Sequence, residues 1–363
     1  MLQLQPPLPE RFITDTPLNA ARIQAAKETL GDRVFILGHH YQRDEVMCWA
    51  DASGDSFRLS QLAQEHPEAD YIVFCGVHFM AESADILTKD HQQVILPDLR
   101  AGCTMADMAD IDEVEEAWEA IAQVTDIDRV VPITYMNSTA AIKSFVGQQG
   151  GAVCTSSNAR AVLEWAFQRG DQVLFFPDQH LGRNTGVAMG YSVDDMALWD
   201  PRQERGGLSE AAVKDSTFLL WKGFCSVHLR FTPQNLRNFR AEHPEATIIV
   251  HPECEHETVL LADAVGSTDA IIRYVEAQPT GAVIGIGTEV HLVSRLASQH
   301  PDKTIVCLDP DLCPCATMNR IDASHLAWVL EGLVEGRVEN QISVDADTQV
   351  WAKVALNRML EIV

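Results

Sequence analysis

The stretch Arg33-Val-Phe-Ile-Leu-Gly-His-His-Tyr41 is a continuous apolar run that stops abruptly in polar residues. Such a run is typical of a strand buried on both faces of a parallel sheet, because a half-exposed strand would alternate apolar and polar residues. Ligands of α/β proteins bind at the carboxyl ends of such strands. The stretch therefore predicts an α/β fold in which His39 and Tyr41 lie at a ligand-binding edge.

The same pattern recurs in three sets, with predicted helical segments between the runs. The first set adds 70–78 and 93–98, the second comprises 130–137, 151–156 and 172–178, and the third comprises 247–253, 282–289 and 304–311. The last run of each set leads into Pro-Asp, at Pro97-Asp98, Pro177-Asp178 and Pro310-Asp311. We therefore predict an internal threefold repeat of β-α-β-α-β units. Right-handed crossovers place the carboxyl ends of a unit's strands at one edge, so three units can direct their edges at one central cavity.

The repeat divides the chain into three predicted α/β units with parallel sheets, at residues 1–115, 116–232 and 233–321. For 363 residues, the usual domain length of roughly 150 residues favours two or three units. The helical tail 322–363 is predicted to pack back on the first unit, with Ala327-Trp328 and Val350-Trp351 as docking points.

Three other segments carry local signals. Residues 1–17 are proline-rich and predict an irregular arm, and residues 18–30 predict an amphipathic helix. Segment 184–217 is rich in Gly, Asp and Arg and has weak periodicity, so it is either a surface excursion of the second unit or a lid over the cavity.

The composition excludes several classes of partner. The chain has 52 Asp and Glu against 27 Lys and Arg, a formal net charge of −25, which argues against nucleic acid and anionic membranes. The 9 cysteines lack regular spacing, which favours free or metal-bound thiols in a reducing compartment. The first residues do not resemble a signal peptide, and no apolar run approaches the ~20 residues of a membrane span. A cytoplasmic location is the expectation.

The cysteines of Asp309-Pro-Asp-Leu-Cys-Pro-Cys-Ala-Thr-Met-Asn319 lack a local metal motif, because Cys313 and Cys315 are too close to be two ligands of a CxxC knuckle. Ligand partners would have to be distant, and Cys103 and Cys225 stand in similar loops. Three thiolates suit an iron–sulfur cluster with one open iron, a Lewis acid, better than structural zinc, which normally takes four protein ligands. The alternative is a set of unrelated buried thiols.

We interpret Cys48, Cys75 and Cys307 as inert core thiols, since free cysteine is among the most buried residue types. Cys154 and Cys254 lie near predicted strand ends, and their role stays open.

Two strand ends carry matching polar patterns, His39-His-Tyr41 and His251-Pro-Glu253. A single histidine at a strand end is usually structural, but two matching sets favour a functional site. Tyrosine or glutamate there can act as general acid or base once burial shifts its pKa.

Four turns rich in hydroxyl groups precede segments that can be helical, at 53–56, 135–139, 154–158 and 266–269. They are either plain N-caps or helix N-termini that bind carboxylates or phosphate, and both can hold. Neither GxGxxG nor GxxxxGK[ST] occurs, so dinucleotide and ATP binding are disfavoured.

Eleven ordered motifs between about residues 33 and 320 together resemble the quinolinate synthase family. They are 39–45, 54–56, 77–82, 97–103, 135–138, 154–158, 177–182, 221–228, 251–253, 266–268 and 315–318.

The resemblance implies three Rossmann-like α/β/α domains around a 4Fe–4S cluster that is held by Cys103, Cys225 and Cys315 and leaves its fourth iron open. Cys315 rather than Cys313 is the ligand, because the family's cysteine precedes x-x-Met. The implied enzyme is a transferase that condenses iminosuccinate (iminoaspartate) with dihydroxyacetone phosphate, releasing phosphate and water, to give quinolinate for NAD biosynthesis. Transient functional coupling to L-aspartate oxidase is a further implication.

The resemblance also implies site residues. Tyr41 and Glu253 would be the acid–base pair, with His251 beside them. The implied binding residues are His39, Ser56, Tyr135, Asn137, Ser156, His228, His251, Glu253, Ser267 and Thr268.

This sequence departs from shorter members of the family, which lack much of segment 184–217. Some members carry C-x-x-C-x-x-C where this chain has Cys-Pro-Cys, so redox switching at that run does not transfer. Two rival functions stay open: a zinc- or iron-dependent lyase or aldolase that uses His39, His251 and nearby carboxylates, with the cysteines incidental, and a non-catalytic iron–sulfur sensor. No basic helix or appended domain supports a sensor.

Overall fold

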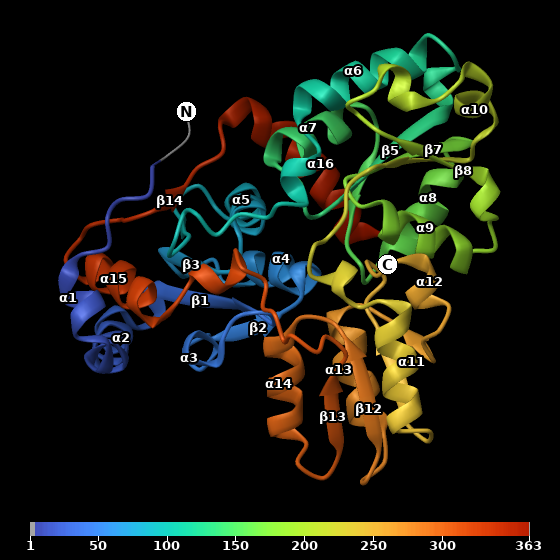
Figure 1. Cartoon of the computed structure of the whole chain (residues 1–363). Helices are drawn as coiled ribbons and strands as arrows, with labels where there is room; N and C mark the ends of the chain where they lie inside the picture. Colours follow the sequence, from blue (N-terminus) through green and yellow to red (C-terminus); the bar gives the residue numbers. More distant parts are fainter. Residues whose placement is uncertain (1–3, 363) are drawn as a thin grey trace. The chain divides into compact units, whose positions relative to one another are not determined.

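The chain is built on three β-sheets with helices on their faces (Figure 1). The structure is a computed structural model and describes residues 4–362. It forms two compact units. The first comprises Met1–Cys103, Glu289–Arg295 and Cys313–Asp345, and the second comprises Thr104–Thr288, Leu296–Leu312 and Ala346–Val363. The first sheet belongs to the first unit, and the other two sheets belong to the second unit.

The first sheet has the strand order β14-β4-β3-β1-β2. Its strands are β1 (Val34–His39), β2 (Ala52–Gly54), β3 (Tyr71–Cys75), β4 (Gln93–Ile95) and β14 (Gln341–Ile342). All neighbours pair in parallel except β14, which is antiparallel to β4. The helices around it are α1 (Glu10–Thr14), α2 (Thr16–Leu30), α3 (Asp44–Met47), α4 (Ser56–Glu65), α5 (His78–Leu87) and α15 (Ala323–Val334). Helices α4 and α5 pack together, and α15 packs on α2.

The second sheet has the order β6-β5-β7-β9-β8 and is parallel throughout. Its strands are β5 (Val130–Tyr135), β6 (Ala152–Cys154), β7 (Gln172–Phe176), β8 (Met196–Trp199) and β9 (Phe218–Trp221). Every residue of β5, β7 and β9 is buried, as expected for strands covered on both faces. The helices are α6 (Ile111–Ala122), α7 (Ala140–Gln148), α8 (Ala159–Phe167), α9 (Gln179–Ala188), α10 (Glu210–Asp215) and α16 (Ala346–Glu361).

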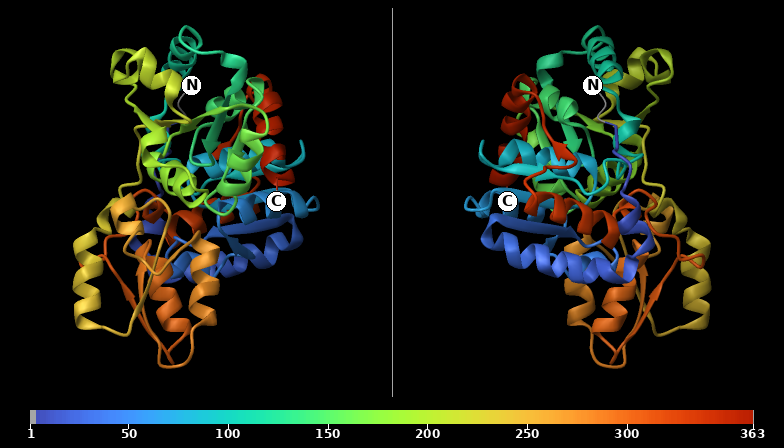
Figure 2. Two further views of the ribbon diagram at one scale, coloured as in Figure 1. Left: turned by 90° about the vertical axis from the view of Figure 1, so that its right-hand side faces the viewer. Right: turned by 90° about the vertical axis from the view of Figure 1, so that its left-hand side faces the viewer.

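The third sheet has the order β11-β10-β12-β13 and is also parallel. Its strands are β10 (Thr247–Val250), β11 (Ala264–Val265), β12 (Val283–Gly287) and β13 (Thr304–Cys307). The associated helices are α11 (Pro233–Glu242), α12 (His256–Val259), α13 (Thr268–Ala277) and α14 (Val290–Gln299). Figure 2 shows α11 and α13 on opposite faces of this sheet.

The strand orders confirm the threefold repeat and the α/β class. With β8 and β14 left out of the numbering, every sheet contains the order second, first, third, fourth: β2-β1-β3-β4, β6-β5-β7-β9 and β11-β10-β12-β13. All nine predicted strands exist. Each repeat contributes four strands to this order rather than three. The prediction missed β2 and β11, which have 3 and 2 residues, and β9, whose apolar run Phe218-Leu-Leu-Trp221 has only 4 residues and follows the weakly periodic segment 184–217.

Because each repeat has a fourth strand, the three Pro-Asp dipeptides do not all lie at equivalent positions. Pro97-Asp98 and Pro310-Asp311 follow the fourth strands β4 and β13, whereas Pro177-Asp178 follows β7, the third strand of its repeat. The fourth strand of the second repeat is β9, which ends at Trp221.

Segment 184–217 is neither a loose excursion nor a separate lid. It contains the end of α9, the strand β8 and the helix α10, and β8 extends the second sheet by pairing with β9. Parallel pairing of this kind needs a crossover, which explains the length of the insertion.

The tail divides between the two units, unlike the prediction that all of it packs on the first. Helix α15 and strand β14 pack within the first unit, where Trp328 is buried. Helix α16 instead packs in the second unit, on helix α7 and strand β6. Gly147 permits this, because a Cβ at that position would collide with the main chain at Trp351. The side chains of Val350 and Trp351 remain 59% and 43% exposed, so the contact at this position is made by the main chain and not by the predicted side chains.

The predicted N-terminal arm is only partly irregular. Residues 10–14 form α1, with Phe12 buried, and residues 1–3 of the predicted arm lie outside the described part of the chain. The helix predicted at 18–30 is α2. Residue 363 of the predicted tail also lies outside the described part. Among the described helices, none combines the length and the apolar character that crossing a bilayer requires. The domain boundaries near residues 115, 232 and 321 stay a prediction.

Candidate active site

The end of the first strand in each repeat carries a pair of polar residues spaced i, i+2. The pairs are His39 with Tyr41, Tyr135 with Asn137, and His251 with Glu253. Two of the pairs share the same turn, because the main-chain N–H of Tyr41 donates to His39 Nδ1 at 3.1 Å and that of Glu253 donates to His251 Nδ1 at 3.3 Å. The sequence pattern recognised two of these pairs, and the sheet topology adds the third.

The second strand of each repeat leads into a helix whose start carries the predicted hydroxyl residues. Ser56 is the first residue of α4, which Asp55 caps, and Thr268 is the first residue of α13, which Ser267 caps by accepting from Ala270 N at 3.3 Å. Ser267 is therefore an N-cap, whatever else it binds.

Ser156 lies just before α8, and no side chain caps that helix. It lines a cavity of about 220 Å³ within the second unit, together with Arg160, Asn184 and Gly266. This cavity gives the start of α8 room for a small ligand.

The fourth strand of each repeat leads into a loop that carries one of the predicted cluster ligands. Cys103 follows β4, Cys225 follows β9, and Cys315 follows β13. All three thiols are partly exposed and none is in a disulfide. The three positions are thus equivalent in the repeat, which sequence spacing alone did not reveal.

The remaining cysteines differ from these three. Cys75, Cys154 and Cys254 are buried, and burial raises the pKa of Cys75 to about 12 and raises the pKa of the other two thiols as well. They are poor thiolate ligands. Cys48 was predicted as a core thiol but is exposed, because it directly follows the four-residue helix α3. Cys307 is partly exposed.

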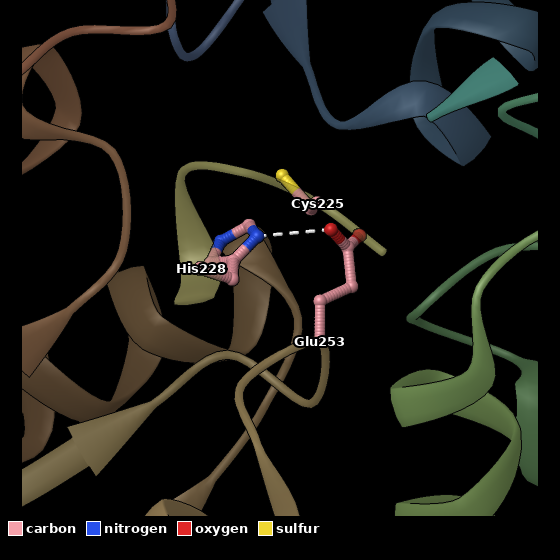
Figure 3. Close-up of side chains that lie close together, drawn as sticks. All are labelled: Cys225, His228 and Glu253. Atoms are coloured by element: carbon pink, nitrogen blue, oxygen red, sulfur yellow. Dashed lines mark hydrogen bonds and ion pairs between the residues drawn. The ribbon is translucent and has the colours of Figure 1, made fainter. Parts of the chain in front are cut away.

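The second unit brings four predicted site residues into one buried polar cluster. Glu253 accepts from the Tyr135 hydroxyl at 2.5 Å through Oε1, and its Oε2 lies 2.9 Å from His228 Nδ1 (Figure 3). The His228 ring stacks on His251 with 4.3 Å between centroids, and its Nε2 lies 3.3 Å from the Thr288 hydroxyl. Thr288 was not predicted from the sequence.

The electrostatics of this cluster depend on burial. Burial lowers the pKa of His251 to about 3, and the neighbouring His228 acts in the same direction. Burial alone would raise the pKa of Glu253, but His228, His251 and the hydrogen bond from Tyr135 outweigh it and lower that pKa to about 2. At neutral pH, Glu253 is a carboxylate and His251 is a neutral imidazole.

Among the described residues, two polar atoms near these strand ends have no hydrogen-bond partner. They are Asn137 Oδ1 and Asp178 Oδ2, and both are buried. Burial and repulsion from Glu253 raise the pKa of Asp178 well above its usual value. Buried polar atoms without partners are rare, and Asn137 Oδ1 is thus suited to accept a hydrogen bond from a ligand.

The third-repeat cysteine is linked to a buried glutamate that was not predicted. Glu289 is fully buried, and its Oε1 accepts from Cys315 N at 3.2 Å and lies 2.9 Å from His291 Nδ1. Its position after an apolar run at Gly287-Thr288-Glu289 is the signal that could have identified it.

The donor atoms of Cys225, His228 and Glu253 lie within 4.8 Å of one another (Figure 3). Within the described residues no other set of three side chains meets that test, and this set includes neither His39 nor His251, which the lyase alternative requires. Both oxygens of Glu253 already serve Tyr135 and His228, so the arrangement favours a hydrogen-bonded network over a closed metal site.

Comparison with known proteins identifies the family. The family model described as quinolinate synthetase A protein (NadA) matches residues 21–361. Curated proteins named quinolinate synthase are similar over nearly the whole chain. That of Corynebacterium glutamicum is 56% identical over 98% of this chain and 91% of its own length. That of a Nocardioides species is 58% identical over 95% and 89%, and that of Bacillus anthracis is 53% identical over 98% and 96%. The repeated sheets, the three loop cysteines and the buried His–Glu–Tyr cluster therefore belong to a chain of the quinolinate synthase family of enzymes.

Proposed function

We propose that this chain condenses iminosuccinate with dihydroxyacetone phosphate to quinolinate, with release of phosphate and water, in NAD biosynthesis. The observation that carries the proposal furthest is the equivalence of Cys103, Cys225 and Cys315, which follow the fourth strand of three repeated sheets. Three partly exposed thiols suit a 4Fe–4S cluster that keeps one iron without a protein ligand. When bound, such a cluster supplies a Lewis acid that polarises an oxygen atom of the substrate.

Glu253 and Tyr41 are the proposed acid–base pair. With a pKa of about 2, Glu253 is a weak base as long as Tyr135 and His228 bind it. Both of these residues are also proposed substrate ligands. A substrate that takes their hydrogen bonds would release Glu253 from its donors and raise its pKa toward a useful value, so substrate binding itself activates the base.

The remaining groups are proposed to bind the two substrates. His39, His251 and the amide of Asn137 offer hydrogen bonds to carboxylates or carbonyls. Ser56, Ser156, Ser267 and Thr268 lie where three helices begin, and helix N-termini favour the negative charges of a dicarboxylate and a phosphoester. These local sites compensate for a net charge of −25, which would otherwise repel both substrates.

A cytoplasmic location is part of the proposal, because thiolate ligands require a reducing compartment. Coupling to L-aspartate oxidase stays a prediction from the family resemblance.

The test is anaerobic reconstitution with iron and sulfide, followed by iron and sulfide analysis and an assay for quinolinate. We expect about four irons per chain with matching sulfide, and product formation. Cys225→Ala should lose the cluster's absorbance and the activity together, whereas Cys48→Ala should keep both. One zinc per chain without sulfide would support the metal-dependent lyase instead, and full iron content in Cys225→Ala would refute the ligand assignment.

Glu253→Gln separates the proton-transfer role from cluster binding. It should keep the iron and the absorbance but lower turnover by about 10² to 10⁴, the usual range for removal of a general acid or base. Turnover within a few-fold of the unmodified protein would reject the role of Glu253.

A further inference from the structure

The loop that carries Cys225 is bordered by the inserted strand β8. β8 pairs in parallel with β9, with Trp199 opposite Trp221, and the N–H of Lys222 donates to Trp199 O at 2.9 Å. The residues just beyond the two strands, Asp200 and Lys222, are consequently neighbours. Lys222 stands three positions before Cys225.

Asp200 is a buried carboxylate that binds Lys222 directly. Lys222 Nζ donates to Asp200 Oδ2 at 2.8 Å, Gln203 Nε2 donates to the same oxygen at 3.1 Å, and Arg202 Nε donates to Oδ1 at 3.1 Å. These hydrogen bonds, that from Lys222 above all, lower the pKa of Asp200, so the carboxylate keeps its charge. The pair is charge-assisted and therefore stronger than a neutral hydrogen bond.

The turn that presents Asp200 is itself held in place. The N–H of Asp200 donates to Gly206 O at 3.1 Å, and Gly206 adopts a left-handed conformation with φ of 65°. A side chain at Gly206 would collide with the ring of Trp199. The carboxylate is thus fixed by its own turn before it meets Lys222.

Other contacts hold the rest of the 221–224 segment. Trp221 Nε1 donates to Met108 O at 2.6 Å, and the N–H of Gln179 donates to Gly223 O at 3.0 Å. The N–H of Phe224 also donates to Met108 Sδ at 3.4 Å. The partner residues of these contacts lie outside segment 184–217. The anchor at Lys222 differs from these contacts because the insertion supplies it.

We propose that the Asp200–Lys222 pair is a positioning device that the insertion adds for Cys225, so that the cluster is released more slowly. The proposal rests on the cluster function proposed above. A ligand loop must open before its cysteine leaves the metal, and an anchor that closes the loop lowers the open population. Neither residue is assigned a role in the chemistry.

The surroundings limit the size of the effect. A cavity of about 340 Å³ borders the pair and is lined by Asp107, Glu113, Arg202 and Phe224 as well as by the pair itself. The Lys222 side chain is 38% exposed, so solvent weakens the ion pair. We therefore expect cluster loss to accelerate by about threefold to tenfold when the pair is broken.

The experiment is a double-mutant cycle on the anaerobically reconstituted full-length protein. The variants are Asp200→Asn, Lys222→Met and the double variant, with Lys222→Arg as the conservative exchange. The control is Glu164→Gln, which removes an exposed ion pair with Arg160 at 2.9 Å on α8. Iron content is measured first, and then the loss of cluster absorbance after addition of an iron chelator. Melting of the cluster-free proteins is measured alongside.

The two single variants should each lose the cluster about threefold to tenfold faster, and the double variant should be no faster than either. Lys222→Arg and Glu164→Gln should behave as the unmodified protein, and cluster-free melting should change little. Loss at the unmodified rate in Lys222→Met, or additive effects in the double variant, would overturn the proposal while leaving the cluster function intact. If the unmodified protein takes up no cluster, both proposals fail. If Asp200→Asn melts early, Lys222→Met and Lys222→Arg decide the outcome.

Discussion

The loops that carry Cys225 and Cys315 occupy the same place in two repeats but are held very differently. The Cys225 loop leaves the interior of a five-stranded sheet, and its residues 221–224 are tied by main-chain and side-chain bonds to Met108, Gln179 and Asp200. The Cys315 loop leaves an edge strand. Leu312 there has a left-handed φ of 49°, and Cys313 is exposed.

The Cys315 loop is tied at two places: Arg230 donates to Asp309 and Asp311 near its start, and a buried carboxylate holds Cys315 itself. Glu289 accepts from the N–H of Cys315 at 3.2 Å, and the Cys315 thiol lies 3.5 Å from the Thr317 hydroxyl. Equivalent positions in a repeat are therefore held by different partners. An inserted strand converts an edge into an interior strand, and the loop after it gains partners on both sides. We expect the Cys225 ligand to be preorganised, and the Cys315 ligand to be ordered in part by the metal.

The largest expected effect comes from overfilling the rigid loop. In Gly223→Ala the new Cβ would meet the carbonyl oxygen of Pro177 far inside van der Waals contact, and overpacking costs about 1–3 kcal/mol. The cluster should be lost at least tenfold faster, as measured by absorbance decay with chelator.

The matched control for that change is Gly102→Ala, which lies next to Cys103 and has nothing within 4 Å of the added Cβ. It should retain the cluster normally. If both variants lost the cluster at the same rate, the Cys225 loop would not be rigid, and the proposed difference between the two loops would be wrong.

A smaller effect is expected from Glu289→Ala, which leaves the N–H of Cys315 and the ring of His291 without their buried acceptor. Hydrogen bonds to charged groups contribute about 1.5–3 kcal/mol, so cluster loss should accelerate by about tenfold. Glu289→Gln keeps one acceptor oxygen, so its rate of cluster loss should lie between those of the unmodified protein and Glu289→Ala. An effect of Glu289→Ala smaller than that of Asp200→Asn would contradict the view that Glu289 holds the Cys315 ligand in place.

The smallest effect is expected from Cys313→Ser. Cys313 is exposed and is not the proposed ligand, so iron content and the rate of cluster loss should stay within about twofold of the unmodified protein, within the small range usual for surface substitutions. Cys315→Ser measured in parallel should lose the cluster. A reversal of these two results would assign the ligand to Cys313 and move it two residues closer to the third sheet.

Much of the fold could be predicted because buried parallel strands read as unbroken apolar runs. The runs 33–41 and 172–178 both contain strands, and every residue of these strands except Phe35 is buried. The missed strands were short ones of 2 to 4 residues, which local patterning does not distinguish from other apolar segments. β11 has only 2 residues, and β8 is a 4-residue apolar run within a weakly periodic segment, where pairing with β9 identifies it as a strand. Hydrogen bonds between distant segments leave no local signal.

The candidate site divides in the same way. The sequence by itself determined which chemistry is present: three loop cysteines, paired histidines with Tyr41 and Glu253, and hydroxyl residues where helices begin. Only the tertiary structure decided that Glu253 is bound by Tyr135 and His228, that Glu289 supports Cys315, and that an inserted strand supplies Asp200 to Lys222. Residue types carry their donors and charges wherever they stand, but burial and partners more than 20 positions away exist only after the chain has folded.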